Sequence, residues 1–332
     1  MNTNSQITDF KGARVLITGG CGFIGSNLTR RLLLSGAHIT LIDSLIPEYG
    51  GNLANLRGIE DQIDINFSDV RDPHSMRFLV RNKDFLFNLA GQTSHMDSMT
   101  DPANDLAINA EAQLSILESC RKENSEIRIV FASTRQLYGR PQYLPVDEKH
   151  PLNPVDVNGI NKLAGEMYHI LYHNVYGIRS SALRLTNTYG PGMRIKDARQ
   201  TFVGIWIRNL LEGKPIEVWG GEQLRDFNHV DDVVDALMLS AVSTQAHGKI
   251  FNLGGNPTIS LLALADLLIK ILGKGELIVK NFPEERKKID IGDYYSDYSF
   301  IQNTLNWSPK VGLEDGLRRT LQYYTENLND YL

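Results

Sequence analysis

Short hydrophobic runs alternate along the chain with longer segments in which apolar residues recur at every third or fourth position. The short runs predict buried β-strands, and the periodic segments predict amphipathic helices. In the first half of the chain, predicted strands and predicted helices alternate, which is typical of a parallel sheet covered by helices on both faces. The strands predicted for this half are residues 15–18, 38–43, 63–68, 85–91 and 128–132.

Two periodic segments predict long helices in this half, over residues 102–121 and 158–175. The apolar stripe of the first consists of Leu106, Ala110, Leu114, Leu117 and Cys120. The stripe of the second consists of Leu163, Met167, Ile170 and Leu171.

After residue 180 the predicted strands become shorter, and residues 186–192 form a turn-rich loop. Ser260 has the position of an N-cap for the apolar run 261–272. We therefore expect a main domain over residues 1–180, with part of its core continuing to about residue 250. A smaller α/β lobe, mainly residues 181–332, would be interleaved with it. The strands predicted here are 181–185, 216–219, 227–230 and 250–253, with helices over 200–212 and from near Asp231, Ser260 and Leu313.

Composition narrows the function classes. The 332 residues are 42% hydrophobic and 22% charged, with a formal net charge of −5, so no excess of positive charge favours a nucleic acid or an anionic membrane as partner. Cys21 and Cys120 are too few for a disulfide framework or a zinc site, and we expect no metal. No apolar run is long enough to span a membrane, and the first nine residues lack the apolar core of a signal peptide. We expect a cytoplasmic protein.

Three glycines follow the first predicted strand with the spacing Gly19-x-x-Gly22-x-x-Gly25, and a helical segment begins directly after them. Strand, glycine turn and helix in this order predict a dinucleotide-binding loop. Gly19 would allow the tight turn, Gly22 the approach of backbone N–H groups to a pyrophosphate, and Gly25 close helix packing. The sequence therefore predicts an α/β fold with a Rossmann-type doubly wound parallel sheet and a smaller α/β C-terminal substrate lobe.

Asp43 ends the second predicted strand 18 residues after Gly25, close to the spacing of the carboxylate that binds the adenosine ribose. A solvated acid at a strand end is the alternative. No arginine follows directly, which favours NAD over NADP. Further residues expected at the cofactor are Phe23 and Ile24 in the glycine loop, Asp69 and Val70 beside the adenine, and Leu89, Ala90 and Gly91 after the fourth strand.

Six ordered segments together resemble the extended short-chain dehydrogenase/reductases that modify nucleotide sugars. The resemblance covers nearly the whole chain and implies NAD as cofactor, a nucleotide-diphosphate sugar as substrate and a homodimer. Members oxidise a sugar hydroxyl, usually at C4, and pass the hydride to NAD. The segments are the cofactor loop 18–25, the fourth strand and next helix (88–91, 101–109), the serine/threonine strand 132–139, the substrate loop 184–191, the diphosphate segment 221–232 and the C-terminal signature 305–309.

The resemblance also assigns catalytic positions. Family members use a tyrosine four residues before a lysine, and a serine or threonine on the preceding strand orients the same sugar hydroxyl. Lys162 matches the lysine and Thr134 the threonine, with Ser133 as its neighbour, but Asn158 stands at the tyrosine position. An asparagine amide cannot accept and return a proton as a phenolate does.

Three hypotheses follow from Asn158. Lys162 acts as the base itself if burial and the nearby cofactor lower its pKa. Alternatively, another acid or phenol reaches the same point, with Tyr138, Tyr143 and Glu166 near enough in sequence. The third possibility is a non-catalytic protein that binds NAD and a nucleotide sugar.

The resemblance places further residues at the substrate. Asn187 is expected at the diphosphate or the sugar, and Arg225 at the diphosphate; an ion pair of Arg225 with Asp226 or Asp231 is the alternative. Arg286 would add a second diphosphate contact, unless its charged segment is only a solvated face. Gln92, Thr93 and Ser94 are expected to line the sugar pocket.

The residues after Thr134 bear on the reaction. A common 4,6-dehydratase has an acid pair there, whereas this chain has Arg135 and Gln136. An epimerase needs no such acid, so we expect a nucleotide-sugar epimerase. The alternatives are a decarboxylase, in which Arg135 would bind the uronic carboxylate, and an atypical dehydratase.

Overall fold

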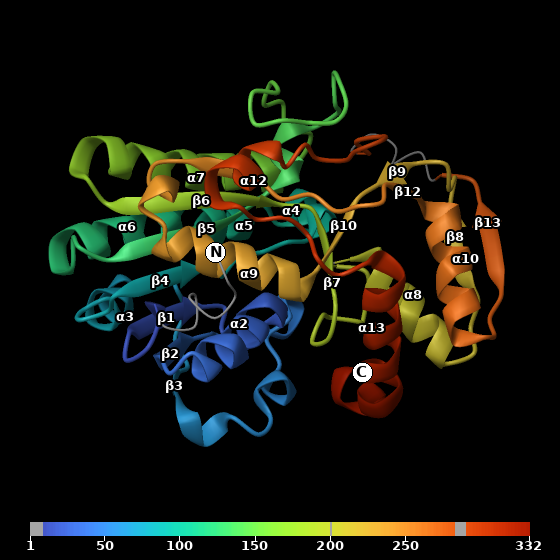
Figure 1. The fold of residues 1–332 in the computed structure, drawn as a ribbon, viewed down its shortest axis with the longest axis horizontal. Coiled ribbons are helices and arrows are strands. Elements are labelled where there is room, and N and C mark those ends of the chain that lie inside the picture. Colours follow the sequence, from blue (N-terminus) through green and yellow to red (C-terminus); the bar gives the residue numbers. More distant parts are fainter. Residues whose placement is uncertain (1–8, 200, 283–289) are drawn as a thin grey trace.

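The computed structural model describes residues 9–199, 201–282 and 290–332, which form a large sheet-centred part and a smaller lobe at one end of it (Figure 1). The large part contains a seven-stranded parallel sheet with the strand order β11-β6-β5-β4-β1-β2-β3. This confirms the predicted Rossmann-type fold. The strands are β1 (Arg14–Thr18), β2 (His38–Ile42), β3 (Ile63–Asn66), β4 (Phe85–Asn88), β5 (Arg128–Thr134), β6 (Arg179–Leu185) and β11 (Ile250–Asn252).

The sheet has a hydrophobic core on each face because side chains of a strand point alternately to its two sides. In β1, Val15 and Ile17 pack in the core beneath helices α2 (Phe23–Leu34) and α9 (Val230–Val242). Leu16 between them belongs to the opposite core. That second face is covered by α3 (Pro73–Leu79), α6 (Ala112–Glu123) and α7 (Val157–Tyr176).

The order of the strands in the sheet indicates where a ligand would bind. From β1 the chain proceeds outward through β2 and β3, and then returns to β4 on the other side of β1. The strand order therefore reverses beside β1, and in such sheets ligands bind at the carboxyl ends of the strands near this switch point. Residues expected at the cofactor follow β1, β2, β3 and β4 at these ends.

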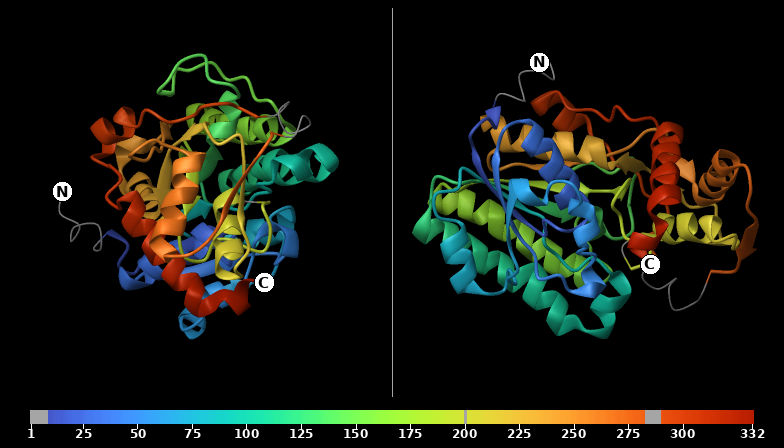
Figure 2. Two further views of the ribbon diagram at one scale, coloured as in Figure 1. Left: turned by 90° about the vertical axis from the view of Figure 1, so that its right-hand side faces the viewer. Right: turned by 90° about the horizontal axis from the view of Figure 1, so that it is seen from below.

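The smaller lobe lies at one end of the sheet (Figures 1 and 2). Its own core contains Trp206, Leu264 and Leu317. The chain enters this lobe more than once, since α9 and β11, which lie between β9 and β12 in the sequence, belong to the large part. Ser260 caps α10 as predicted, accepting a hydrogen bond from Ala263 N. The elements of the lobe are α8 (Phe202–Leu211), β8 (Ile216–Trp219), β9 (Leu224–Arg225), β12 (Ile259–Ser260), α10 (Leu261–Leu272), β13 (Leu277–Lys280) and α13 (Leu313–Asn327).

Two elements differ from the expected pattern. The segment 102–121 is not one regular helix: α5 (Pro102–Leu106) passes through a widened π-helical turn, η4 (Ala107–Glu111), before α6 begins. Within the expected stripe Leu106 and Leu114 are exposed. The expected loop 186–192 contains a strand, β7 (Asn187–Tyr189), which pairs in parallel with β10 (Phe227–His229).

The remaining short elements connect these layers, and none of the described helices is long and apolar enough to cross a membrane. The described residues also contain no cluster of three or more His, Cys, Asp or Glu side chains suited to a metal ion. The short helices are η1 (Pro47–Tyr49), η2 (Leu53–Leu56), η3 (Glu60–Gln62), α4 (His95–Thr100), η5 (Arg135–Tyr138), η6 (Thr244–Ala246), α12 (Ser299–Leu305) and η7 (Leu328–Tyr331).

Candidate active site

A cavity of about 730 Å³ extends from the carboxyl ends of the sheet strands into the smaller lobe. Nearly all residues that the sequence placed at a cofactor or substrate lie on its wall. Arg286 lies outside the described residues, and Gln92 is not on the wall. The predicted residues on the wall are Gly19, Gly22, Phe23, Ile24, Gly25, Asp43, Asp69, Val70, Leu89, Ala90, Gly91, Thr93, Ser94, Ser133, Thr134, Asn158, Lys162, Asn187 and Arg225.

The glycine turn leaves no room for side chains. Gly19 has a φ of +67°, and Gly22 N donates a hydrogen bond to Gly19 O at 3.1 Å. A Cβ atom at Gly25 would lie 2.3 Å from Gly19 O. The backbone of Gly19, Gly22 and Gly25 therefore faces the cavity without side chains at the start of α2, which fits a pyrophosphate at a helix N-terminus.

Asp43 lies directly after β2, and its side chain is hydrogen-bonded to the backbone of the glycine turn. Its carboxylate oxygens accept hydrogen bonds from Cys21 N at 3.0 Å and Leu45 N at 2.9 Å. Burial raises the pKa of the Asp43 carboxyl. Its place at the carboxyl end of β2 suits an adenosine ribose, as the spacing predicted.

The ends of β3 and β4 complete this side of the cavity. Asp69 forms an ion pair of 2.6 Å with Arg71, and Val70 beside it is buried. A Cβ atom at Gly91 would lie 2.9 Å from Lys162 Nζ, so a larger residue there would displace the lysine side chain. The switch-point end of the cavity thus fits a dinucleotide such as NAD.

Lys162 lies on α7, and its side chain is 5% exposed. Its ammonium group donates a hydrogen bond to Ala132 O at 3.0 Å and lies 4.9 Å from the centre of the Phe131 ring. Burial lowers the pKa of Lys162 to about 8, although the charge of Asp105 opposes this shift. Lys162 therefore places a cationic side chain on the cavity wall, one helical turn after Asn158.

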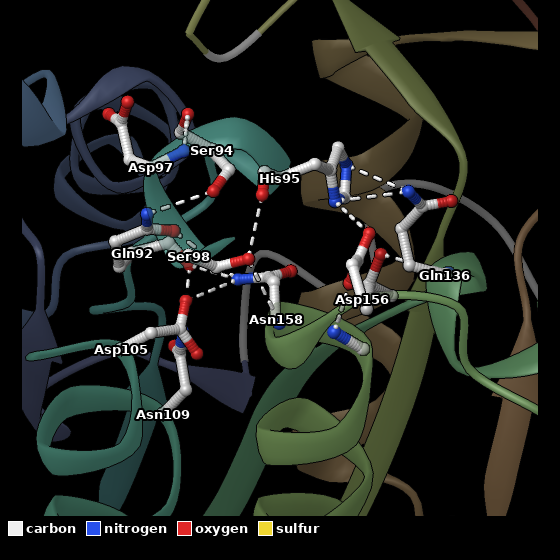
Figure 3. A network of polar contacts seen from close by, with 12 residues as sticks. Gln92, Ser94, His95, Asp97, Ser98, Asp105, Asn109, Gln136, Asp156 and Asn158 are labelled. Carbon is white, nitrogen blue, oxygen red and sulfur yellow. Dashed lines mark hydrogen bonds and ion pairs between the residues drawn. The ribbon is translucent and has the colours of Figure 1, made fainter. Parts of the chain in front are cut away.

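Asn158 lies in the first turn of α7 and is buried in a polar network (Figure 3). Its amide Nδ2 donates hydrogen bonds to Gln92 O at 2.8 Å and to Asp105 Oδ2 at 3.0 Å. Asn161 donates to the other oxygen of Asp105 at 2.8 Å. The amide of Asn158 thus joins α7 to α5 and to the segment after β4.

Gln92 does not meet the expectation that it lines the sugar pocket. Its side chain is 2% exposed, and its Nε2 donates to Ser94 O at 2.9 Å. The Asn158 and Asn109 amides both donate to its backbone carbonyl. These hydrogen bonds direct the Gln92 side chain towards the protein interior. Thr93 and Ser94 line the cavity instead.

The two hydroxyls at the end of β5 have different partners. Ser133 is buried and donates to Glu166 Oε2 at 2.6 Å. Thr134 caps η5 by accepting a hydrogen bond from Gln136 N at 3.3 Å, and it retains its own hydroxyl proton for donation. Thr134 is therefore the hydroxyl available to a ligand, and Ser133 belongs to a buried network.

Positive charge gathers at the opposite end of the cavity. Arg225 is 6% exposed, lies 3.7 Å from Asp290 and donates to two backbone carbonyls. Its acidic partner is therefore not Asp226 or Asp231, the pairing considered from the sequence. Burial and the nearby charge of Arg135 lower the pKa of Arg225 to about 10.

Arg135 and Asn187 form a second polar pair on this wall. Arg135 Nη2 donates to Asn187 Oδ1 at 3.0 Å, and the Asn187 amide donates to Asp226 O at 2.9 Å. Arg135 also lies over the Tyr294 ring, but its buried Nη1 has no hydrogen-bond partner within the described part of the chain. Two arginines on one wall suit an anionic group.

The three alternative proton acceptors considered from the sequence are not on the cavity wall. Tyr138 donates to Asn252 and accepts from Arg184, and burial raises its pKa to about 12. Glu166 forms a buried ion pair of 2.6 Å with Arg184. Tyr143 is exposed and donates to Asp147. These contacts hold all three groups away from a ligand.

Three residues near Asn158 were missed from the sequence. His95 and Gln136 line the cavity, and the buried Asp156 lies behind His95 at 3.0 Å (Figure 3). Asp156 is the N-cap of α7, so its position before a helical segment was a signal for capping. Nothing local connects it with His95, because the two come from separate segments.

Comparison with known proteins agrees with this geometry. The family model described as "NAD dependent epimerase/dehydratase family" matches residues 15–254. The UDP-glucose 4-epimerase of Mycolicibacterium smegmatis is 30% identical over 315 residues, covering 94% of this chain and 98% of that protein.

Solved structures are similar over nearly the whole chain. UDP-glucose 4-epimerase from Thermotoga maritima, solved with UDP-glucose, has a TM-score of 0.87 at 30% identity, covering 95% of this chain and 99% of that one. The dTDP-glucose 4,6-dehydratase of Streptomyces venezuelae, solved with NAD, has a TM-score of 0.87 at 26% identity, covering 95% and 98%. The chain therefore belongs to the NAD-dependent epimerase/dehydratase family, with NAD as its cofactor.

Proposed function

We propose that this protein is a nucleotide-sugar epimerase, which oxidises a hydroxyl of an activated hexose, at C4, and reduces the ketone from the other face. The observation that supports this reaction most is the cavity wall after β5. A 4,6-elimination needs an acid there to protonate the departing C6 hydroxyl, and the residues after Thr134 are Arg135 and Gln136. An epimerisation needs no such acid.

The carboxylates on the described cavity wall lie elsewhere. Asp43 and Asp69 follow β2 and β3, where the adenosine end of the cofactor is expected. Glu217 pairs with Lys280 in the lobe, and Asp290 lies beside Arg225. A carboxylic acid beside Thr134, as an elimination requires, is therefore missing from the part of the wall that the structure describes.

Each role in this reaction would be taken by residues on the cavity wall. The turn Gly19–Gly25 and Asp43 hold NAD, which when bound accepts a hydride from the sugar carbon and returns it. Lys162 holds the ribose next to the nicotinamide. Thr134 donates a hydrogen bond to the sugar oxygen that reacts. Arg225 and Asn187 bind the diphosphate, with the unpaired Nη1 of Arg135 nearby.

A second candidate reaction, decarboxylation of a nucleotide-linked uronic acid, is favoured by one observation. Arg135 is partly buried on the cavity wall, and its buried Nη1 lacks a hydrogen-bond partner among the described residues. A uronic carboxylate would supply that partner. Desolvation lowers the pKa of Arg135, and an anionic ligand would relieve this penalty.

Product analysis separates these reactions. The purified protein with NAD would be incubated in turn with UDP-glucose, dTDP-glucose and UDP-glucuronic acid, and the products identified by NMR. The C4 epimer of the glucose or uronic acid moiety supports the proposal. A 4-keto-6-deoxy sugar identifies a dehydratase, and a pentose identifies a decarboxylase. Binding of all three sugars without product or transient cofactor reduction identifies a non-catalytic binding protein.

A further inference from the structure

The missing phenol raises the question of which group takes the proton of the sugar hydroxyl. Asn158 has no basic atom, and its amide is directed to Gln92 and Asp105. The Lys162 ammonium donates a hydrogen bond to Ala132 O. His95 also lies on the wall, and 38% of its side chain is exposed there.

His95 has the partner that a catalytic imidazole needs. Its Nδ1 lies 3.0 Å from Asp156 Oδ2, and that carboxylate is 1% exposed. The contact between Asp156 Oδ2 and His95 is a close approach and not an aligned hydrogen bond, and no other described residue donates to this oxygen. Oδ1 caps α7 by accepting from Gly159 N at 2.7 Å. One oxygen therefore fixes the carboxylate in place, and the other faces the ring.

Gln136 connects this pair with Thr134. Its amide nitrogen lies 3.0 Å from both ring nitrogens of His95, and its backbone N–H donates to Thr134 Oγ1. The amide oxygen of Gln136 is buried without a partner in the described structure. The NH₂ group of Gln136 can donate a hydrogen bond to the unprotonated nitrogen of a neutral His95 ring. If the amide rotates by 180° about χ3, its oxygen can instead accept a hydrogen bond from an N–H of the charged ring.

We propose that His95, oriented by Asp156, is the proton acceptor and donor of the reaction, in place of a tyrosine. The inference rests on the proposed function. As the hydride leaves the sugar carbon for the nicotinamide oxidant, the O–H bond breaks, the C=O bond forms and the proton moves to His95 Nε2. In the return step the same proton goes back to the oxygen. Asp156 stabilises the charged ring, as a carboxylate does for a catalytic histidine elsewhere.

The ring tautomer tests this assignment without any turnover. If Asp156 accepts from Nδ1–H, the neutral ring keeps its lone pair on Nε2. We expect ¹⁵N NMR of the histidine-labelled holoprotein to show the Nδ1–H tautomer for His95, with the signal assigned by its loss in His95→Gln. Asp156→Asn retains a capping side chain but should shift the tautomer population towards Nε2–H. An Nε2–H tautomer in the wild-type protein contradicts the proposal.

Turnover gives the second test. His95→Gln should slow product formation from UDP-glucose, dTDP-glucose or UDP-glucuronic acid by roughly 10²–10⁴-fold, the usual contribution of a general base. His38→Gln is the matched control, because His38 is exposed at the amino end of β2, opposite the cavity. If His95→Gln stays within a few-fold of an active wild type, the histidine assignment is wrong and the proposed function stands. If the wild type converts none of the sugars, both proposals are wrong.

Discussion

Lys162 carries a charge where the protein compensates it poorly. Its ammonium is buried, with one carbonyl within hydrogen-bond distance and an aromatic ring below. Folding therefore favours the neutral amine, and burial lowers the pKa from 10.5 to about 8. A bound ribose would provide further hydrogen-bond acceptors for the ammonium group.

The first prediction concerns the pH dependence of stability. Below about pH 8 the lysine is charged in both states, and folding bears the full burial penalty. Between about pH 8 and 10.5 the unfolded chain binds the proton and the folded protein does not, so the free energy of unfolding rises with pH. The rise attributable to Lys162 is on the order of 3 kcal/mol.

Urea denaturation of the apo protein at several pH values, compared with Lys162→Met, isolates this effect. The free energy of unfolding of the wild type should increase relative to the variant across that interval. A difference that stays constant from pH 7 to 11 would show that Lys162 titrates alike in both states.

Gly25 gives a second prediction at the residue scale. A methyl group there would lie 2.3 Å from the carbonyl oxygen of Gly19 and 2.9 Å from Gly20 Cα. Gly25→Ala must therefore displace the turn, and we expect NAD affinity to fall by 10-fold or more, about 1.4 kcal/mol. Calorimetric titration with NAD measures this, and Gly312→Ala is the control because a Cβ atom at Gly312 meets open space. Unchanged affinity in Gly25→Ala would disprove the proposed role of the turn.

Between elements, a buried ion pair joins β6 to α7. Arg184 and Glu166 are 3% and 0% exposed, and two N–H groups of Arg184 donate to the two carboxylate oxygens. Ser133 on β5 adds a third donor to Glu166. Two strands and one helix are therefore held at this point by a single carboxylate.

Glu166→Gln should lower the free energy of unfolding by about 3–5 kcal/mol, because it leaves the Arg184 charge buried without its counterion. Chemical denaturation measures the loss. Glu314→Gln removes an exposed pair with Arg318 on α13 and should change stability by less than about 1 kcal/mol. Equal losses in the two variants would contradict this ranking.

Elements set by local pattern were predictable from the sequence, and elements set by tertiary contacts were not. The first five strands, the glycine turn and the Ser260 cap each depend on neighbouring residues. The π-helical turn at 107–111 brings Asn109 to the carbonyl of Gln92, which no local spacing reveals. The β7 strand forms only because β10 lies beside it.

The same distinction applies to the site. The cofactor residues follow consecutive strands, so fold class was sufficient to bring them together. The His95–Asp156 pair was not predictable, because one residue begins α4 and the other caps α7. Gln92 was misplaced because its hydrogen bonds to distant amides decide which way its side chain turns.

At the scale of the whole molecule, α7 has an apolar face that the other described residues leave exposed. Ile160, Met167, Leu171 and Val175 are 54%, 51%, 50% and 59% exposed. Their spacing along α7 puts them on one side of the helix, away from the sheet. We propose that two copies of the chain bury this face in a homodimer, as the family resemblance implies.

Light scattering after size-exclusion chromatography tests the dimer. Leu171→Glu places a charge at the centre of the face and should convert the dimer to a monomer at micromolar concentration. Leu34→Glu is the control, since Leu34 is 80% exposed at the end of α2 on the other side of the sheet. A wild-type protein of monomer mass would refute the proposal.

The strand order has a consequence for the protein during its synthesis. Six strands of the sheet are complete once the ribosome has made residue 185, but the seventh, β11, follows only at residues 250–252. At about 5–20 residues per second, β6 remains an unpaired edge for several seconds. Such an edge can pair with another nascent chain. Slow translation of the stretch between β6 and β11 would therefore favour aggregation of the newborn protein, whereas a chaperone that shields β6 would protect it.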